Sequence, residues 1–218
     1  MPWEKTVKMH LLIATTNPAK FGRYMAIFGI IPNLSLLSLT DISSLEAPDE
    51  PYPTAEENAR HKAKWYAQRT GYAAFASDEA LFVDFLPKKQ QPGVFVRRNP
   101  ETGKSMTDQE VYAYWKEKVL SLQGEHKGVF HHGLCLAMPG GQSFSASVDR
   151  PFLFQNPPLS SYIPGWPLSA FFKDSATGKI YAEMTEEEKQ TRDIPLQQES
   201  LRLVRFWLEN VSRETKKV

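Results

Sequence analysis

The sequence has a single cysteine, no dense run of like charges and no apolar stretch of membrane-spanning length. Cys135 alone cannot form an intramolecular disulfide and excludes zinc sites built on several cysteines, which fits a reducing cytoplasm. The formal charge is +1 and no run of five like charges occurs, so the electrostatic footprint of a nucleic-acid-binding surface is missing. No stretch approaches the ~20 apolar residues of a membrane span, and the polar residues 1–9 show no secretory or membrane signal. We therefore expect a cytoplasmic protein whose partners are neither nucleic acid nor membrane.

What the sequence does contain suits a globular protein with a large core. Its 218 residues are 41% hydrophobic and 23% charged, which fits one large domain or two lobes. Helix and strand patterns alternate early in the chain, and an antiparallel hairpin is expected at residues 129–138 and 143–148, joined by Pro-Gly-Gly. This order predicts an α/β fold with a mixed sheet flanked by helices.

The start of the chain predicts a strand that runs directly into a helix. Residues 10–14 form a short apolar run, Asn17 is a good N-cap, and Pro18 occupies the first helical position, where its missing N–H costs nothing. Apolar residues then recur at helical spacing until Gly29. A short strand is expected within 34–39.

Two capping-box patterns predict the next helices. Thr54 with Glu57 opens a helix that ends before Gly71, and its buried stripe consists of Ala59, Ala63, Tyr66 and Ala67. Thr107 with Glu110 opens another. Further elements are expected as strands at 73–76 and 81–85, on either side of an acidic turn, and as a closing amphipathic helix at 196–211.

The turn between the first strand and the first helix is a candidate phosphate site. A helix N-terminus supplies backbone N–H groups and a favourable dipole, and Lys20, one turn in, adds a positive charge. Thr15, Thr16 and Asn17 add polar side chains. Taken alone, this segment favours the alternative of an ordinary helix cap followed by a solvated lysine.

Acidic residues provide a candidate metal site. Glu50 and Asp78, together with Glu79 or Asp84, could bring oxygen ligands together, which suits Mg²⁺ bound by one or two carboxylates plus substrate phosphates. Such an ion neutralises phosphate charge and lowers the pKa of attacking water. The alternative interpretation leaves Glu50 on a solvated acidic loop and gives Asp84 a structural hydrogen bond.

Several motifs, in a fixed order, carry a resemblance to one family. They are residues 15–20, Glu50 with 54–59 and 62–63, residues 77–81, residues 92–95, and then 165–166 and 179–184, ending with Lys189. On these motifs, which extend over about residues 10–210, the chain resembles the inosine triphosphate pyrophosphatase family of Ham1-like enzymes, also called non-canonical purine NTP pyrophosphatases.

The resemblance implies an activity, a fold and a set of site residues. It implies that a nucleoside triphosphate is hydrolysed to the monophosphate and pyrophosphate with Mg²⁺, in a central cleft between two lobes of an elongated mixed sheet, within one domain spanning 1–218 and usually in a homodimer. By this resemblance, the phosphates would be bound by Thr15, Asn17, Lys20 and Lys62. The metal would be bound by Glu50, Asp78 and Glu79, and Asp78 would activate water. Trp166 would stack on the base, Lys189 would approach the base or phosphates, and Arg98 matches a cleft arginine. Asp78, Glu50 and Lys20 are the predicted catalytic residues.

The chain also departs from the family pattern. Where the family has Asp-Asp-Ser-Gly-Leu, this chain has Ser77, Asp78 and Glu79 followed by Ala-Leu, so the first carboxylate is lost and a new one follows Asp78. Pro167 replaces an aspartate near the base, and the Ser-His-Arg that reads the 6-oxo group is replaced around residues 191–195. Because a site reads a base through paired donors and acceptors, these changes predict altered base recognition with phosphate handling mostly kept.

Three functional hypotheses follow. The first is a Mg²⁺-dependent nucleoside triphosphate pyrophosphatase with an altered base preference. The second is a nucleotide-binding protein of the same fold that is catalytically weak or inactive, and the third is a structural or partner-binding dimer. Several other residues have structural interpretations: His131 and His132 face opposite sides of a strand, and Cys135, Trp115 and Trp207 are expected in the core.

Overall fold

The computed structural model describes residues 8–42 and 45–215, so most of the polar segment at residues 1–9 lies outside the described residues. The strands are β1 (Met9–Ile13), β2 (Leu34–Leu37), β3 (Ala73–Val83), β4 (Lys127–Ala137), β5 (Ser143–Phe154) and β6 (Phe172–Asp174). The α-helices are α1 (Pro18–Phe28), α2 (Ala55–Thr70), α3 (Asp108–Leu120) and α4 (Glu186–Thr215), and short 3₁₀ helices span Lys88–Gln90, Pro167–Phe171 and Tyr181–Glu183.

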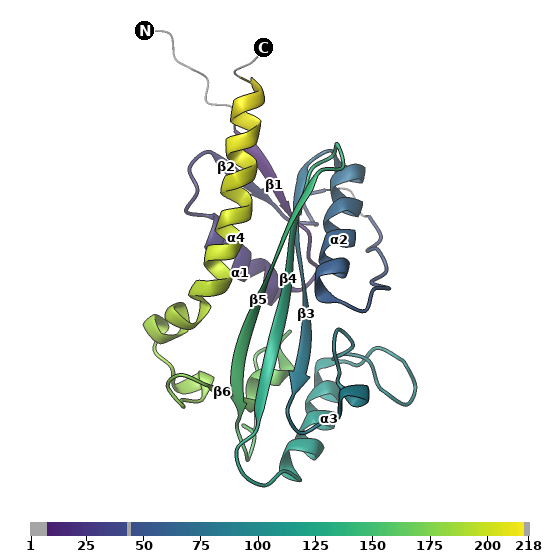
Figure 1. The fold of residues 1–218 in the computed structure, drawn as a ribbon, viewed down its shortest axis with the longest axis vertical. Helices are drawn as coiled ribbons and strands as arrows, with labels where there is room; N and C mark the ends of the chain where they lie inside the picture. The colour runs from purple at the N-terminus through teal and green to yellow at the C-terminus, as the bar shows by residue number, and fades with distance from the viewer. Residues whose placement is uncertain (1–7, 43–44, 216–218) are drawn as a thin grey trace. The chain divides into compact units, whose positions relative to one another are not determined.

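The strands form one six-stranded sheet in the order β2-β1-β3-β4-β5-β6 (Figure 1). β1 pairs in parallel with both β2 and β3, whereas β5 pairs antiparallel with β6. The predicted α/β fold, with a mixed sheet flanked by helices, is confirmed. The expected hairpin is also confirmed as β4 and β5, which are neighbours in the sheet and longer than the sequence predicted.

The chain divides into two compact units. The first contains the described residues of Met1–Asp78, Gly133–Ser147 and Leu196–Val218, and the second contains Glu79–His132 and Val148–Pro195. Strands β3, β4 and β5 each contribute residues to both units.

The first unit is organised around α2, whose small residues allow close packing against the strands. Its predicted stripe is buried, and it forms a core cluster with apolar residues of β1, β3 and β4. Thr54 caps the helix, because its Oγ1 accepts a hydrogen bond from Glu57 N (3.3 Å) and donates one to Glu57 Oε2 (2.7 Å). Gly71 ends the helix in the left-handed conformation (φ 72°), as glycine at that position favours.

The second unit has an aromatic core. Trp115 and Val119 of α3 pack with Leu81, Phe152 and Phe172 in a cluster that the strands complete. The predicted capping box at the start of α3 is present, with Thr107 and Glu110 bonding each other's backbone N–H groups. The other buried members of this core cluster are Val83, Met106, Val111, Phe130, Phe154, Leu168, Ala170 and Phe171.

The prediction of two strands separated by an acidic turn is wrong. β3 runs without interruption from Ala73 to Val83, and Asp78 and Glu79 lie in the middle of it. Acidic residues are disfavoured in strands when only local preference is considered. Here, however, tertiary partners compensate, because Asp78 accepts a hydrogen bond from Asn58 and Glu79 pairs with His132.

The predicted start of the last helix is also wrong. α4 begins at Glu186 rather than at Leu196, and Pro195 lies inside it. Thr185 Oγ1 accepts a hydrogen bond from Glu188 N, and Glu188 Oε2 accepts one from Thr185 N, so a capping box that the sequence analysis missed opens the helix. Pro195 removes one backbone donor, but the helix continues beyond it.

The structural interpretations of the remaining residues are confirmed. Trp115, Trp207 and Cys135 are buried. The two adjacent histidines of β4 have different partners, since His132 is buried and lies beside Glu79 whereas His131 pairs with Asp149. None of the helices in the described part of the chain is long and apolar enough to span a membrane.

The approach of β4 to the N-terminus of α2 leaves no space for a side chain at Gly133. A Cβ there would overlap the backbone of Ala55 and Glu56. We therefore predict that Gly133→Ala lowers the free energy of unfolding by about 1–3 kcal/mol or more, as overpacking does. Chemical denaturation measures this, and Gly140→Ala, where a Cβ meets no atom within 4 Å, is the control. Equal stability of the two variants would contradict the close approach.

Candidate active site

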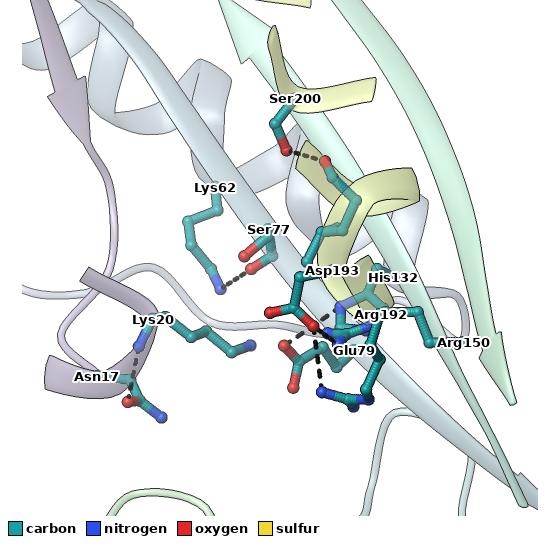
Figure 2. Close-up of polar contacts among 11 residues, drawn as sticks. Asn17, Lys20, Lys62, Ser77, Glu79, His132, Arg150, Arg192, Asp193 and Ser200 are labelled. Atoms are coloured by element: carbon teal, nitrogen blue, oxygen red, sulfur yellow. Dashed lines mark hydrogen bonds and ion pairs between the residues drawn. The ribbon is translucent and has the colours of Figure 1, made fainter. Parts of the chain in front are cut away.

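The turn before α1 contains the first predicted site residues. Thr15 Oγ1 accepts a hydrogen bond from Asn17 N (3.1 Å), and Asn17 Oδ1 accepts one from Ala19 N (2.9 Å). Asn17 Oδ1 also accepts a hydrogen bond from Lys20 N (3.3 Å) (Figure 2). Asn17 is thus the N-cap that the sequence predicted, and its side chain takes two of the backbone donors at this helix end. Any phosphate at this turn would be met by the Lys20 ammonium and the helix dipole, and by those amides only if Asn17 moved.

Asp78 is the buried centre of the first unit's polar cluster. Its exposed fraction is only 8%, and its Oδ2 accepts a hydrogen bond from Asn58 Nδ2 (3.1 Å). Asn58, also buried, exchanges hydrogen bonds with the backbone N–H and C=O of Tyr52, each 3.0 Å long. One amide side chain therefore connects the loop before α2, the helix itself and the carboxylate on β3.

Charges around Asp78 oppose one another. Burial raises the pKa of the Asp78 carboxyl above its ordinary range, the positive charges of Lys20 and Lys62 lower it, Glu50 raises it, and the Asn58 hydrogen bond lowers it. The net direction is upward, because desolvation of the carboxylate is the largest effect. A carboxyl with a raised pKa close to two ammonium groups is typical of a catalytic site.

Lys62 and Glu50 form an ion pair beside this carboxylate. Lys62 Nζ also donates to the backbone oxygen of Ser77 (3.4 Å), which fixes it next to the strand that carries Asp78 (Figure 2). Lys62 lies one helical turn beyond Asn58 on α2, so the two side chains share a face. The structure thus brings four of the predicted site residues together in one unit: Lys20, Glu50, Lys62 and Asp78.

Ser77 stands where the family pattern has its first aspartate. Its side chain is buried, and its Oγ has no hydrogen-bond partner among the described residues. A buried hydroxyl without a partner is unfavourable by about 1–3 kcal/mol. A serine at this position therefore leaves a buried polar group that the described residues do not satisfy.

The oxygen donors of this unit fit a hard divalent cation. Among residues 8–42 and 45–215, no three His, Cys, Asp or Glu side chains are already grouped to hold a metal ion. Glu50 and Asp78 are nonetheless close enough for the charge of one to raise the pKa of the other. Mg²⁺ is typically bound by one or two carboxylates together with substrate phosphates, so this pair suits it. Asp84 has the structural role considered for it, accepting hydrogen bonds from Lys127 N (2.9 Å) and His126 Nδ1 (3.1 Å).

In the second unit, Trp166 belongs to a wall of aromatic rings. Its ring centroid lies 5.1 Å from that of Tyr181, 5.6 Å from that of Phe172 and 6.5 Å from that of Phe130. The guanidinium of Arg192 lies 4.0 Å from the Phe172 centroid and 5.7 Å from that of Trp166. We call these four rings the aromatic wall.

The backbone before Trp166 is held by an ion pair that the sequence analysis missed. Arg97 pairs with Asp108 (2.7 Å) and donates to the Gly165 carbonyl (3.0 Å), while Asp108 Oδ2 accepts from Gly165 N (2.7 Å). The predicted Arg98 instead lies over the Phe95 ring, 4.6 Å from its centroid. Lys189 donates to Glu186 (2.7 Å) and lies 5.2 Å from the Tyr181 centroid.

A charged group lies next to the aromatic wall. Glu79 of β3 pairs with His132 of β4 (3.3 Å), and the buried Arg150 of β5 pairs with Asp193 of α4, which also accepts from Arg192 Nη1 (3.1 Å) (Figure 2). Arg150 and His132 carried no signal in the sequence beyond being polar residues within apolar strands. The sequence signal for Asn58 was clearer. An asparagine on the apolar face of a helix is expected to be buried, and a buried polar side chain needs a hydrogen-bond partner. Asn58 lies four residues before Lys62.

Comparison with known proteins identifies the family. Residues 11–194 match the model of the Ham1 family, and the chain therefore belongs to the Ham1 family. A dITP/XTP pyrophosphatase of Brucella melitensis is 32% identical over 189 residues, covering 84% of this chain and 82% of the relative. One from Geobacter sulfurreducens is 31% identical over 180 residues, covering 82% of this chain and 87% of the relative.

Solved structures agree with the sequence relatives. The crystal structure of a nucleoside-triphosphatase / dITP/XTP pyrophosphatase from Mycobacterium abscessus superimposes with a TM-score of 0.62 and 25% identity, covering 84% of this chain and 93% of that protein. The fold described above is thus that of the family.

The raised pKa of Asp78 has a consequence for stability. A carboxyl whose pKa is higher in the folded than in the unfolded protein favours folding at low pH, and this contribution is lost as the pH rises through the folded-state pKa. The ionised carboxylate is therefore a cost at neutral pH. We predict that Asp78→Asn raises the melting temperature at pH 7 and that this gain shrinks as the pH falls into the range where Asp78 is protonated.

Thermal denaturation of both proteins across a pH series measures the difference. Asp49→Asn, on the exposed loop before Glu50, is the control and should show no such pH-dependent gain. A lower melting temperature for Asp78→Asn at every pH would contradict the assigned direction of the pKa shift.

Proposed function

We propose that this protein is a Mg²⁺-dependent pyrophosphatase that hydrolyses nucleoside triphosphates to the monophosphate and pyrophosphate, with a base preference that differs from that of its relatives. The observation that carries the proposal is the grouping of the Lys20 and Lys62 ammonium groups with Glu50 around the buried Asp78 carboxyl. The names of the relatives from Brucella and Geobacter, both dITP/XTP pyrophosphatases, support it.

The lysines bind the triphosphate. Lys20 extends from the first turn of α1, where the helix dipole also favours an anion. Lys62 is held by Glu50 and by the Ser77 carbonyl in the absence of substrate, and phosphate oxygens replace Glu50 as its partner. Thr15 and Asn17 fix the shape of the turn on which the phosphates rest.

Asp78 acts as the base. Its raised pKa makes it a better proton acceptor than an ordinary aspartate, and the Asn58 hydrogen bond fixes the orientation of its carboxylate. It takes a proton from the water that attacks the α-phosphorus. As the new oxygen–phosphorus bond forms, the bond from the α-phosphorus to the bridging oxygen breaks, and pyrophosphate leaves with that oxygen. Mg²⁺ held by Glu50 and Asp78 would neutralise phosphate charge and lower the pKa of that water when bound. Glu79, the next residue along the continuous strand β3, faces the opposite side of the strand and pairs with His132, so it is not proposed as a ligand of the same ion.

A catalytically weak or inactive nucleotide-binding protein is the second candidate. The observation in its favour is Ser77, whose buried hydroxyl has no partner within the described residues and stands where the family has a carboxylate. With one acidic group fewer, the site would bind the phosphates and hold the cation less firmly. The homodimer, the cytoplasmic location and the lack of a nucleic-acid partner remain predictions.

The decisive experiment is pyrophosphate release with Mg²⁺ across a panel of canonical, deaminated and modified nucleoside triphosphates. We predict turnover of at least one class, and a loss of about 10²–10⁴-fold in kcat for Asp78→Asn, as expected when a general base is removed. Asp49→Asn is again the control and should retain activity. If the Asp78→Asn variant kept wild-type turnover, Asp78 would not be the base, and strong preference for ITP and XTP over all canonical nucleotides would refute the altered base preference.

The pH profile tests the role of Asp78 independently. Only the ionised carboxylate accepts a proton, so kcat/KM should fall as the pH decreases through the pKa of Asp78. Because burial raises that pKa, the acid limb should lie above the ordinary aspartate range near about 4. An acid limb at or below that range would argue against Asp78.

Chelation tests the cation. We predict that excess EDTA abolishes turnover and that added Mg²⁺ restores it, because phosphate charge would otherwise be neutralised by two lysines alone. Pyrophosphate release before and after Mg²⁺ is returned measures the effect. Full activity in the presence of the chelator would exclude the metal requirement.

A further inference from the structure

The polar edge of the aromatic wall is formed by three side chains that differ in exposure. Arg150 and Arg192 are almost covered, with 5% and 10% of their side chains exposed, whereas 33% of the Asp193 side chain is exposed. Both arginines reach the same atom of Asp193, its Oδ1. The group that a ligand at this edge would meet is therefore the carboxylate and not the guanidinium groups behind it.

The second oxygen of this carboxylate accepts no hydrogen bond from the arginines. Both of their hydrogen bonds to Asp193 end on Oδ1, and no hydrogen bond to Oδ2 is found in the described part of the chain. The arginines keep the carboxylate in one orientation, because the buried Arg150 extends from strand β5 and Arg192 is itself packed on the Phe172 ring. The wall thus carries a fixed hydrogen-bond acceptor at its edge.

A flat base stacked on the wall would be read by this acceptor. Asp193 is linked to the wall through Arg192, which donates to its Oδ1 (3.1 Å) and whose guanidinium lies 5.7 Å from the Trp166 centroid and 5.5 Å from that of Tyr181. The carboxylate is therefore one hydrogen bond away from a group that lies against these two partly exposed rings. A carboxylate accepts hydrogen bonds from an amino group and repels the lone pairs of a keto oxygen. Donors for a 6-oxo group were expected to be missing, and Asp193 offers a hydrogen-bond acceptor at the edge of the wall.

We propose that Asp193 is a specificity-determining residue and that it selects nucleotides whose base carries an exocyclic amino group over their deaminated, oxo-bearing counterparts. This inference rests on the proposed function, since it names the base of the substrate. It predicts a preference opposite in sense to the names of the relatives, which act on dITP and XTP.

The wild-type protein provides the first test. Three pairs of substrates differ only in an amino or an oxo group: ATP and ITP, GTP and XTP, and CTP and UTP. A hydrogen bond to a charged group would favour the amino member of at least one pair by about tenfold to a hundredfold in kcat/KM. A preference for the oxo member, or none, in all three pairs would overturn the proposal.

A variant assigns the preference to Asp193. Asp193→Asn keeps the size of the side chain but adds a donor, so the amino-to-oxo ratio of the selective pair should fall to about one or reverse. Asp149→Asn, on the exposed side of β5 next to Arg150, is the matched control and should leave the ratio unchanged. An unchanged ratio in a folded Asp193→Asn variant would overturn the proposal.

Failure of the proposed function is separable from failure of this inference. If no nucleotide is hydrolysed, equilibrium binding of non-hydrolysable analogues of the same six nucleotides gives the ratio in place of kcat/KM. If Asp193→Asn does not fold, because Arg150 loses its partner, the double variant Arg150→Met with Asp193→Asn removes the buried charge and is measured instead. A ratio of about one in the wild-type protein under either readout counts against Asp193.

Discussion

The cost of keeping a carboxylate out of water is the constraint on which the first unit depends. Asp78 lies in the middle of a strand and is buried, in a position where an ionised group is unfavourable. Asn58 supplies its hydrogen bond, and two lysines supply positive charge. The lysines that lower the electrostatic cost of the buried carboxylate are also the groups proposed to bind phosphate. The stability of this unit and its proposed function therefore depend on one arrangement of charges.

In the second unit, the rings of Trp166 and Tyr181 are partly exposed and yet packed against the core. Trp166 is preceded by Gly165 (φ 80°), a conformation that side-chain-bearing residues rarely adopt, and the Arg97–Asp108 pair holds this backbone from both its N–H and its C=O. Phe172 and Phe152 stack behind it with centroids 5.2 Å apart. The position of the partly exposed Trp166 ring is therefore set by the polar contacts of the preceding Gly165 and by packing against other aromatic rings.

Much of this could be predicted from the sequence because it depends on neighbouring residues. Caps at Asn17, Thr54 and Thr107 and the stop at Gly71 are local, and all were correct. The prediction of an acidic turn at Asp78 and Glu79 was wrong because the low strand preference of acidic residues is compensated by tertiary partners. These partners, Asn58 and His132, lie far away in the sequence. Contacts such as Arg150 to Asp193, 43 residues apart, leave no periodic trace in a single sequence.

The close seat of α2 on β4 bears on how the protein can respond to a ligand. The backbone of Gly133 lies against the backbone at the start of α2, and the buried face of the helix consists largely of alanines. Because no long flexible side chains separate the helix from the strands, it cannot easily shift or tilt. Lys62 and Asn58 therefore extend from a helix whose position is fixed by close packing. The loop that carries Glu50 is joined to the helix through side chains instead, by the ion pair of Glu50 with Lys62 and by the two hydrogen bonds between Tyr52 and Asn58. Under the proposed function, adjustment to different triphosphates therefore falls to that loop rather than to the helix and strands.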